Sequence, residues 1–172
     1  MLPILLFGIS AAGCRRPSQR IDLIDRIGEA QKSPGPSVFF IEDTDLGGER
    51  HRAVAIAPVP GSRLSWRLTI PRGAWLWVSI GMQTEAWKNE GDGVKFIAGV
   101  ADGGAFKPLF EQHLHPYARE GDRKWFPIRV PLAPYEGREV EIVFTTTASA
   151  NGPGVDERHD LPLWGVPEIV VR

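Results

Sequence analysis

The sequence has only one cysteine, Cys14, and a single thiol has no intramolecular partner. A fold held together by disulfides is therefore excluded. An excess of either charge is also missing, since 20 Lys and Arg residues stand against 21 Asp and Glu residues. The resulting net charge of −1 provides no basic field that could hold nucleic acid. The 172 residues are enough for one domain with a hydrophobic core.

Recognisable catalytic motifs are missing as well. The sequence contains no Gly-x-Ser-x-Gly nucleophile turn, no paired-glycine phosphate loop and no His-Glu-x-x-His zinc motif. Carboxylates are plentiful, but none lies in a recognisable acid/base arrangement. We therefore expect that this chain has no enzymatic activity of its own.

The apolar run Leu2–Ala12 is too short to cross a membrane as a helix, because it would span about 16 Å of a hydrocarbon core of about 30 Å. Its length is typical of the apolar part of a signal peptide. The run ends at Gly13-Cys14, and small residues before a lone cysteine resemble a bacterial lipoprotein signal. In such a signal the cysteine thiol is lipidated and the residues before it are removed.

Two features differ from the usual lipoprotein pattern: no Lys or Arg precedes the run, and Ala11 stands where Leu is usual. An uncleaved N-terminal anchor and a buried N-terminal strand or helix are the alternatives. We expect residues 1–13 to be a signal peptide, and residues 14–36 to hold the lipidated Cys14, a tether and a short helix. This organisation predicts a bacterial cell-envelope protein, anchored to a membrane and facing the periplasm or the cell exterior.

One segment has the periodicity of a helix. Ile21, Ile24 and Ile27 form an apolar stripe at three-residue spacing, with charged residues between them. The sequence Ser33-Pro34-Gly35-Pro36 would end such a helix. We expect a short helix over 21–30 that docks on the domain or on a partner, because a helix of this length is marginal alone.

From residue 37 onward the pattern changes to short strands separated by turns, in a chain with 19 Gly and 15 Pro residues. Within Ser62–Ile70, apolar Leu64 and Trp66 alternate with polar Arg63 and Arg67, the period of a strand with one solvated face. Nine strands are predicted without intervening helices: Val38–Glu42, Glu49–Ala57, Ser62–Ile70, Trp75–Met82, Val94–Ala101, Lys107–Leu114, Trp125–Pro131, Glu139–Thr147 and Pro167–Val171. This cadence predicts an all-β fold, an antiparallel β-sandwich or jelly roll over residues 37–172.

Several phrases of the sequence are familiar together and in order: LGGERHRAVAIAPVPGSRLSWRLTIPRGAWLWVSIGM, GDGVKFIAGV, HLHPYAREGDRKWFPIRVPLAPYEGREVEIVFTTT and WGVPEIVV. Over Leu46–Val171 they resemble a bacterial galactose-binding-like jelly-roll domain. Such domains are similar to carbohydrate-binding modules and occur in envelope proteins, sometimes beside sulfatase domains. The resemblance implies a jelly roll and sugar binding as a function, although one fold hosts many activities.

Sugar binding requires flat aromatic faces beside polar groups. Trp87 lies in a predicted loop, whereas Trp66 and Trp164 fit a core. We expect Trp75 and Trp77 on opposite faces of one strand, with one of them turned away from the core. The candidate ligand-binding residues are Trp87, Trp77, Asn89, Arg119, Arg123 and Asn151.

Metal binding is a further hypothesis. The resemblance implies a structural calcium ion, held by carboxylate and carbonyl oxygens. Its candidate ligands are Glu42, Asp43, Asp45 and Glu168, with Asp92 in the middle of the chain. His113 and His115, with Glu111, could instead ligate zinc or copper from one face of a strand, or be ordinary surface residues. No other cofactor is expected.

Two functions are compatible with these features. The preferred one is a non-catalytic envelope lipoprotein, an accessory or structural subunit docked on a membrane-associated protein complex by its flat sheet face and the 21–30 helix. The alternative is a carbohydrate- or glycan-binding module that uses loop aromatics. An exposed aromatic groove would favour the glycan, and an unburied isoleucine stripe would favour the protein partner.

Overall fold

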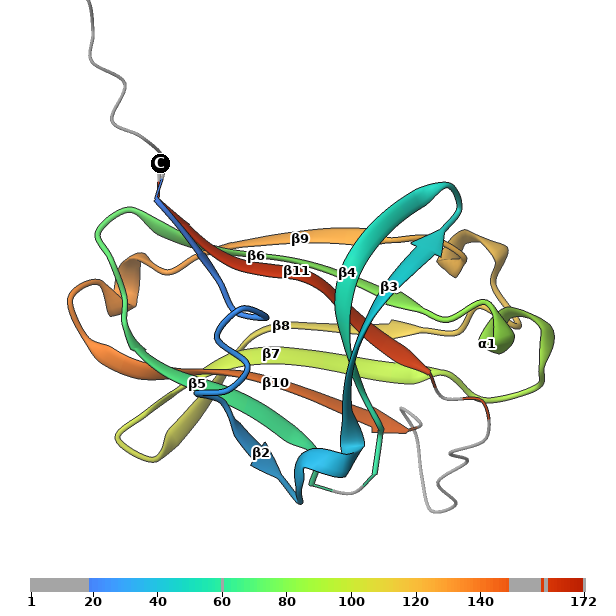
Figure 1. The fold of residues 1–172 in the computed structure, drawn as a ribbon, viewed down its shortest axis with the longest axis horizontal. Coiled ribbons are helices and arrows are strands. Elements are labelled where there is room, and N and C mark those ends of the chain that lie inside the picture. Colours follow the sequence, from blue (N-terminus) through green and yellow to red (C-terminus); the bar gives the residue numbers. More distant parts are fainter. Residues whose placement is uncertain (1–18, 60, 149–158, 160, 172) are drawn as a thin grey trace, which may run out of the picture.

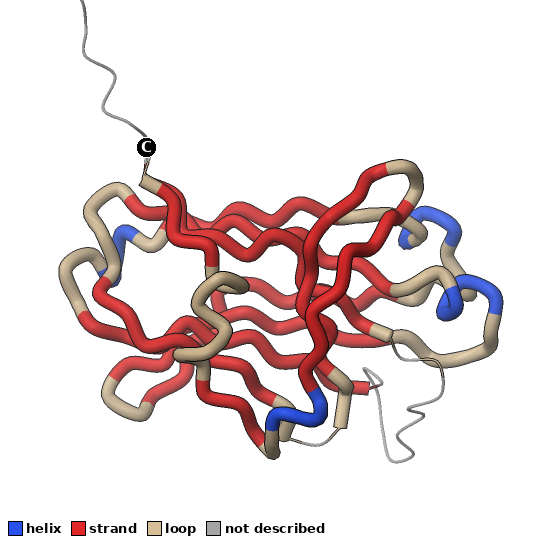
Figure 2. The backbone as a smooth tube through the Cα atoms, in the orientation of Figure 1, coloured by secondary structure: helices blue, strands red, loops and turns tan. Residues whose placement is uncertain are grey.

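The computed structural model describes residues 19–59, 61–148, 159 and 161–171 as a sandwich of two antiparallel sheets (Figures 1 and 2). The strands are β1 (Arg20–Asp22), β2 (Gln31–Ser33), β3 (Phe39–Leu46), β4 (Glu49–Ile56), β5 (Arg63–Thr69), β6 (Ala74–Met82), β7 (Val94–Asp102), β8 (Ala105–Leu114), β9 (Phe126–Pro131), β10 (Glu139–Ala148) and β11 (Pro162–Val171). The one α-helix of the described residues is α1 (Glu85–Lys88), and single 3-10 turns lie at Pro36–Val38, Glu120–Asp122 and Ala133–Tyr135.

The two sheets combine strands that are distant in the sequence. The six-stranded sheet has the order β3-β4-β11-β6-β9, with β1 added to β11, and the five-stranded sheet has the order β2-β5-β10-β7-β8. Each of the nine predicted strands corresponds to a strand of the structure. The predicted fold class, an antiparallel jelly-roll sandwich, is confirmed.

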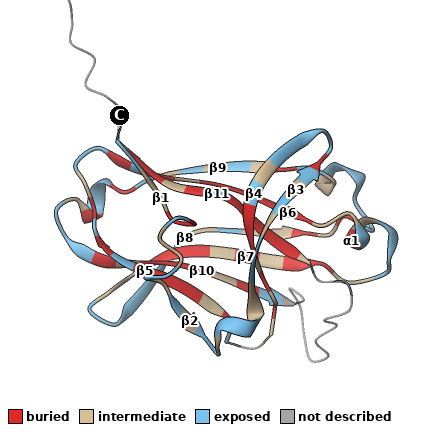
Figure 3. Ribbon diagram, viewed as in Figure 1, coloured by how far each residue is buried: buried red, intermediate tan, exposed pale blue. Residues whose placement is uncertain are grey.

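Alternating side chains divide each strand between the core and the solvent. On β5 and β10, Trp66 faces Ile142 and both are buried, whereas Arg67 faces Glu141 on the outer face. Trp66 and Trp164 lie in the core, as predicted. The Trp164 ring stacks on Phe144, with centroids 4.5 Å apart and planes at 2°. Buried residues line the space between the sheets (Figure 3).

The segment predicted as a helix over 21–30 requires correction. Its first residues form β1, which pairs with β11, and the chain then makes tight turns before β2. The Asp22 carboxylate accepts hydrogen bonds from the backbone N–H groups of Ile24 and Asp25, at 2.7 and 3.1 Å, and so favours a turn. Leu23 and Ile24 are buried in the core. Because β1 and β2 belong to the two sheets, the sandwich begins before residue 37.

The last strand starts earlier than predicted, at Pro162 instead of Pro167. Pro167 lies inside β11, where the pairing with β6 shifts register between Gly165 and Glu168. Because proline lacks an N–H group, a bulge is where a strand tolerates it. Within the described ranges, no helix is long and apolar enough to cross a membrane.

Candidate functional site

Trp87, the aromatic residue of the predicted loop, packs against the hydrophobic core. Trp87 belongs to α1, and its ring is half-buried. The ring packs against the main hydrophobic core and against a smaller cluster of buried residues that includes Leu46 and Trp125. Its indole N–H donates a hydrogen bond to the Met82 carbonyl at 2.9 Å. The prediction that Trp87 offers an open stacking face for a sugar does not match this packing.

The polar loop candidates hold the loops together. Asn89 donates to the Glu85 carbonyl at 2.8 Å, Arg119 to the His113 carbonyl at 2.9 Å, and Arg123 to the Pro116 carbonyl at 2.8 Å. The cavity in this region has a volume of only about 10 Å³. Of the candidate residues in these loops, Asn89 lines this small cavity, and the Arg119 and Arg123 side chains bond to nearby backbone carbonyls. Asn151 and Cys14 lie outside the described residues.

The four carboxylates predicted to bind calcium do not converge. Glu42, Asp43 and Asp45 lie on β3, an edge strand, whereas Glu168 lies on β11, beyond β4. Glu168 pairs with Arg20 at 3.1 Å. Among the described residues, no group of three or more His, Cys, Asp or Glu side chains has the geometry of a metal site. The expected calcium cage is not assembled.

His113, in β8, and His115, just after β8, both lie close to backbone carbonyl oxygens. His113 Nε2 lies 3.0 Å from the Asp92 carbonyl, and His115 Nε2 lies 2.7 Å from the Gly91 carbonyl. Burial lowers the pKa of His113 below its ordinary value of 6.5, which favours the neutral ring. Glu111 pairs instead with Lys95 at 2.6 Å. These contacts connect the end of β8 to the Gly91–Asp92 loop that precedes β7.

Trp75 and Trp77 share one face, which corrects the expectation that they point in opposite directions. Residues two apart on a strand lie on the same side, and the neighbours Ala74, Leu76 and Val78 are the buried ones. Both indoles lie on the outer face of the six-stranded sheet. Arg129 lies over the Trp77 ring at 4.6 Å and Arg20 at 5.7 Å.

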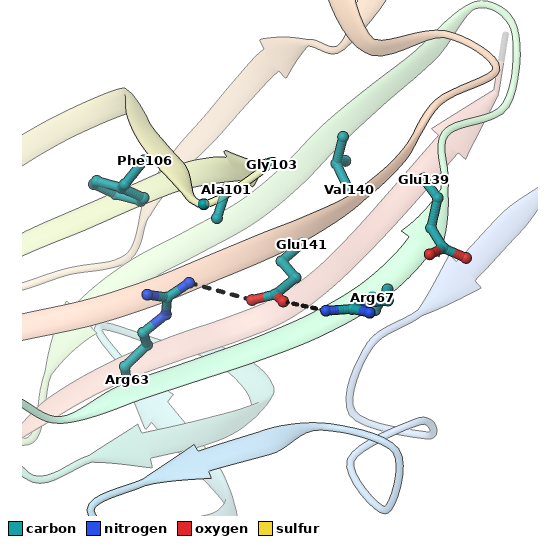
Figure 4. A pocket seen from close by; sticks show the side chains of 9 residues that line it. Arg63, Arg67, Ala101, Gly103, Phe106, Glu139, Val140 and Glu141 are labelled. Atoms are coloured by element: carbon teal, nitrogen blue, oxygen red, sulfur yellow. Dashed lines mark hydrogen bonds and ion pairs between the residues drawn. The ribbon is translucent and has the colours of Figure 1, made fainter.

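A trough crosses the outer face of the five-stranded sheet. A cavity of about 440 Å³ lies over β5, β10 and β7 and ends at the β7–β8 hairpin (Figure 4). A second cavity of about 360 Å³ continues it toward β2 and shares the Arg63 and Glu141 side chains with the first. From β2 to β8 the trough crosses four inter-strand steps of about 4.8 Å, or about 19 Å in all.

The floor of this trough consists of small side chains. Ala101, Gly103 and Gly104 line the first cavity, and Ser65 lines the second. Val143, which strand register places opposite Ser65, lines an adjoining cavity that shares Arg63 and Phe106 with the first. Ser65 and Val143 are almost fully buried beneath the taller side chains around them. Small residues in the middle and long residues beside them produce a depression on a sheet that would otherwise be flat.

Charged side chains form one wall of the trough. Arg63 lies 3.2 Å from one Glu141 oxygen, and Arg67 lies 2.9 Å from the other, as Figure 4 shows. The hydrogen bond from Arg67, helped by the charge of Arg63, holds the pKa of Glu141 below its ordinary value of 4.5. The wall therefore presents fixed donors and a carboxylate acceptor together.

An exposed aromatic ring closes the other side. Phe106 is 43% exposed and lies against Gly99, where an added Cβ would approach the ring carbons to 2.5 Å. The missing side chain at Gly99 lets the ring rest on the sheet. One face of Phe106 is thus supported by the backbone while the ring stays accessible from the trough.

Sequence reasoning found part of this site. The alternation in β5 identified Arg63 and Arg67 as part of a solvated face. It did not identify Glu141 or Phe106 as their neighbours, because these residues come from β10 and β8. The Gly99–Phe106 contact crosses a bulged strand pair, and no local sequence signal marks it.

The fold has solved counterparts among carbohydrate-binding modules. The CBM51-2 and INT domains of ZmpB from Clostridium perfringens match with a TM-score of 0.58 at 13% identity, covering 89% of this chain and 32% of that chain. The same module in complex with GlcNAc has a TM-score of 0.56 at 14% identity, with coverages of 89% and 32%. The CBM22-2 xylan-binding domain of Xyn10C from Paenibacillus barcinonensis has a TM-score of 0.51 at 11% identity, with coverages of 89% and 98%.

Similarity in sequence is more restricted. An uncharacterized protein from Archaeoglobus fulgidus is 38% identical over 101 residues, which cover 58% of this chain and 25% of that protein. The chain thus corresponds to about a quarter of the length of this relative. No protein-family model matches the sequence. Among solved structures, the shared property is the arrangement of strands: the chain has the jelly-roll β-sandwich fold of carbohydrate-binding modules, and its galactose-binding-like resemblance is confirmed at the level of fold.

Proposed function

We propose that this protein is a non-catalytic glycan-binding module whose ligand lies in the trough on the five-stranded sheet. The observation that carries the proposal is the Phe106 ring, supported by Gly99 and facing the Arg63–Glu141–Arg67 wall. The fold similarity to carbohydrate-binding modules supports it. The binding surface differs from the loop site that the sequence analysis favoured.

The chemistry of the trough suits a polyhydroxylated ligand. Sugar hydroxyls accept hydrogen bonds from guanidinium groups and donate to carboxylates, and the paired ions of the wall supply both kinds of partner. An aromatic ring gains contact from the apolar C–H face of a sugar, and Phe106 is placed for that contact. The shallow trough suits an extended ligand better than a small enclosed one.

Docking on a protein complex through the N-terminal stripe receives less support. Ile24 is buried and Ile21 and Ile27 pack partly against the core, so the stripe is used inside the domain. The accessory-subunit role stays a prediction. We also propose that Cys14 carries a lipid that holds the module in the bacterial cell envelope, which the lipoprotein-like signal of the sequence supports.

The experiment that tests glycan binding replaces Phe106. Retention of the full-length protein is measured by affinity electrophoresis in gels that contain xylan, laminarin, peptidoglycan fragments or teichoic acid. We expect retention in at least one gel, with Phe106→Ala weakening the affinity about tenfold, the equivalent of about 1.4 kcal/mol. Because Phe106 lies outside both hydrophobic core clusters, the thermal midpoint of the variant should change little.

The matched control is Phe40→Ala, which removes an equally large ring that is 58% exposed on β3 of the other sheet. It should leave retention unchanged. Equal losses in the two variants, or no retention of the wild-type protein by any polymer, would contradict glycan binding at this trough.

A further inference from the structure

The outer face of the six-stranded sheet carries two tryptophans side by side. Trp75 is 36% exposed and Trp77 is half-buried, and both project from β6 on the side away from the core. Between Trp75 and Arg20 lies Val170, whose register places it opposite both residues and which is itself almost fully covered. This half of the sheet is therefore an indole platform with an apolar base.

Guanidinium groups surround the platform. Arg20 and Arg129 lie over the Trp77 ring, and Arg72 is exposed in the turn that leads into β6. The carboxylates around this face have partners in the protein. Glu168 pairs with Arg20, and Glu49, which lines the same groove as Trp77, lies 2.7 Å from His51. Glu136 accepts a hydrogen bond from the Gly73 N–H at 2.9 Å. Tryptophan and arginine together are the side chains that prefer the boundary between lipid and water.

The bulge of β11 lies on the same face. Val166 has a backbone φ of 39°, a strained value for a β-branched residue, and its side chain is 38% exposed. A groove of about 280 Å³ separates Val166 from the Trp77 ring and Pro127. The face thus offers aliphatic, indole and guanidinium groups in one surface, with a shallow hollow between them.

The start of the described chain lies close to the face that carries Trp75 and Trp77. Val171 donates its N–H to the Gln19 carbonyl at 2.9 Å, so the chain enters beside the C-terminal end of β11 (Figure 1). Only five peptide units join Cys14 to Gln19, and even fully extended they span at most about 18 Å. A lipid on Cys14 therefore lies within about 18 Å of Gln19. Gln19 bonds to Val171, and the neighbouring Val170 pairs with Trp75, so the lipid is close to the tryptophan face.

We propose that the Trp75–Trp77 face is the surface by which this domain rests on the lipid bilayer. The indoles lie at the headgroup level, and Arg20, Arg72 and Arg129 contact phosphate groups. This inference rests on the proposed lipid anchor at Cys14 for its location. The outer faces of the two sheets point in opposite directions, so the trough is then turned away from the membrane, toward the glycans outside it.

The test uses the fact that Cys14 is the only cysteine. The full-length chain is coupled through the Cys14 thiol to maleimide-bearing lipid in vesicles of phosphatidylcholine and phosphatidylglycerol that contain a nitroxide-headgroup quencher. The fluorescence of Trp75 and Trp77 is obtained by subtracting the signal of the double variant Trp75→Phe/Trp77→Phe from that of the wild type. We expect the quencher to reduce this difference signal. Adding Phe106→Trp to that double variant places an indole on the trough face, and its fluorescence should stay unquenched.

Two results would overturn the proposal: unquenched fluorescence from Trp75 and Trp77 in the coupled protein, or equal quenching of the indole from Phe106→Trp. Unquenched Trp75 and Trp77 would indicate that this face binds a protein or a second glycan instead of lipid. Equal quenching of the indole from Phe106→Trp would indicate that the domain has no fixed orientation on the membrane. Because the coupling is chemical, a failure of natural lipidation does not alter this result. Glycan retention is measured without vesicles, so each proposal can fail separately.

Discussion

Glu141 shows how much one carboxylate organises in this molecule. Its two oxygens join Arg63 and Arg67, which come from the neighbouring strand, and its side chain is only 19% exposed. Without it, two guanidinium groups on one strand would face each other across the buried Ser65. The bridge therefore sets the shape of the trough wall in addition to its charge.

We predict that Glu141→Gln lowers the free energy of unfolding at pH 7 by about 1 kcal/mol, as expected for two partly exposed ion pairs. Because the pKa of Glu141 is lowered in the folded state, this contribution is complete above pH 4.5. It is lost as the pH falls through the lowered value. Urea unfolding at pH 7 and pH 3 measures the difference between the two proteins.

The neighbouring variant Glu139→Gln removes the same charge from the same strand without breaking the bridge, and it serves as the control. A pH-independent difference between Glu141→Gln and the wild type would show that packing, and not the ionised carboxylate, accounts for the effect.

At the scale of elements, the segment that precedes the predicted sandwich is part of the domain. The Trp66 indole N–H donates to the Arg26 carbonyl at 3.2 Å, so the turns of residues 23–30 provide a partner for a core side chain. Leu23 has no exposed surface. This segment covers one end of the core in place of the helix that its isoleucine spacing suggests.

We predict that Leu23→Ala lowers the free energy of unfolding by about 2–5 kcal/mol, the cost of emptying a buried leucine site. The exposed Gln31→Ala variant on β2 should stay within about 0.5 kcal/mol of the wild type. Guanidinium unfolding followed by near-UV circular dichroism gives both values. A cost for Leu23→Ala as small as that for Gln31→Ala would mean that the segment is a loose tether after all.

The spacing of side chains explains which elements could be predicted. In β5 the alternation of Leu64, Trp66 and Leu68 with charged residues has only one interpretation, because a strand with one buried face requires a period of two. The spacing of Ile21, Ile24 and Ile27 is ambiguous, since successive three-residue turns bring the same residues together as a helix does. The Asp22 turn and the pairing of β1 with β11 decide between these structures.

At the scale of the whole molecule, the two sheets offer two surfaces of different chemistry. The trough combines Phe106 with paired ions, and the opposite face combines Trp75 and Trp77 with arginines. The proposed lipid anchor gives this asymmetry a direction, since the entry of the chain lies on the side of the tryptophans.

We predict that the chain purified from membranes of a bacterial host begins at Cys14 and carries acyl chains on its thiol. Mass spectrometry of the intact protein and metabolic labelling with a palmitate analogue measure this, with Cys14→Ser as the unlabelled control. A chain that retains Met1 and a free thiol in the membrane fraction would indicate the uncleaved anchor instead.

The sequence alone determined the class of fold. A strand with one buried face requires apolar and polar side chains to alternate, whatever its position in the sheet. The sequence also marked Arg63 and Arg67 as solvated, for the same reason. Only the tertiary structure decided that these arginines meet Glu141 and lie across the sheet from Phe106, since their strands are far apart in the chain and adjacent only through pairing. It likewise decided that Trp87 packs into the core while Trp75 and Trp77 remain outside, because the burial of an aromatic ring depends on what covers it.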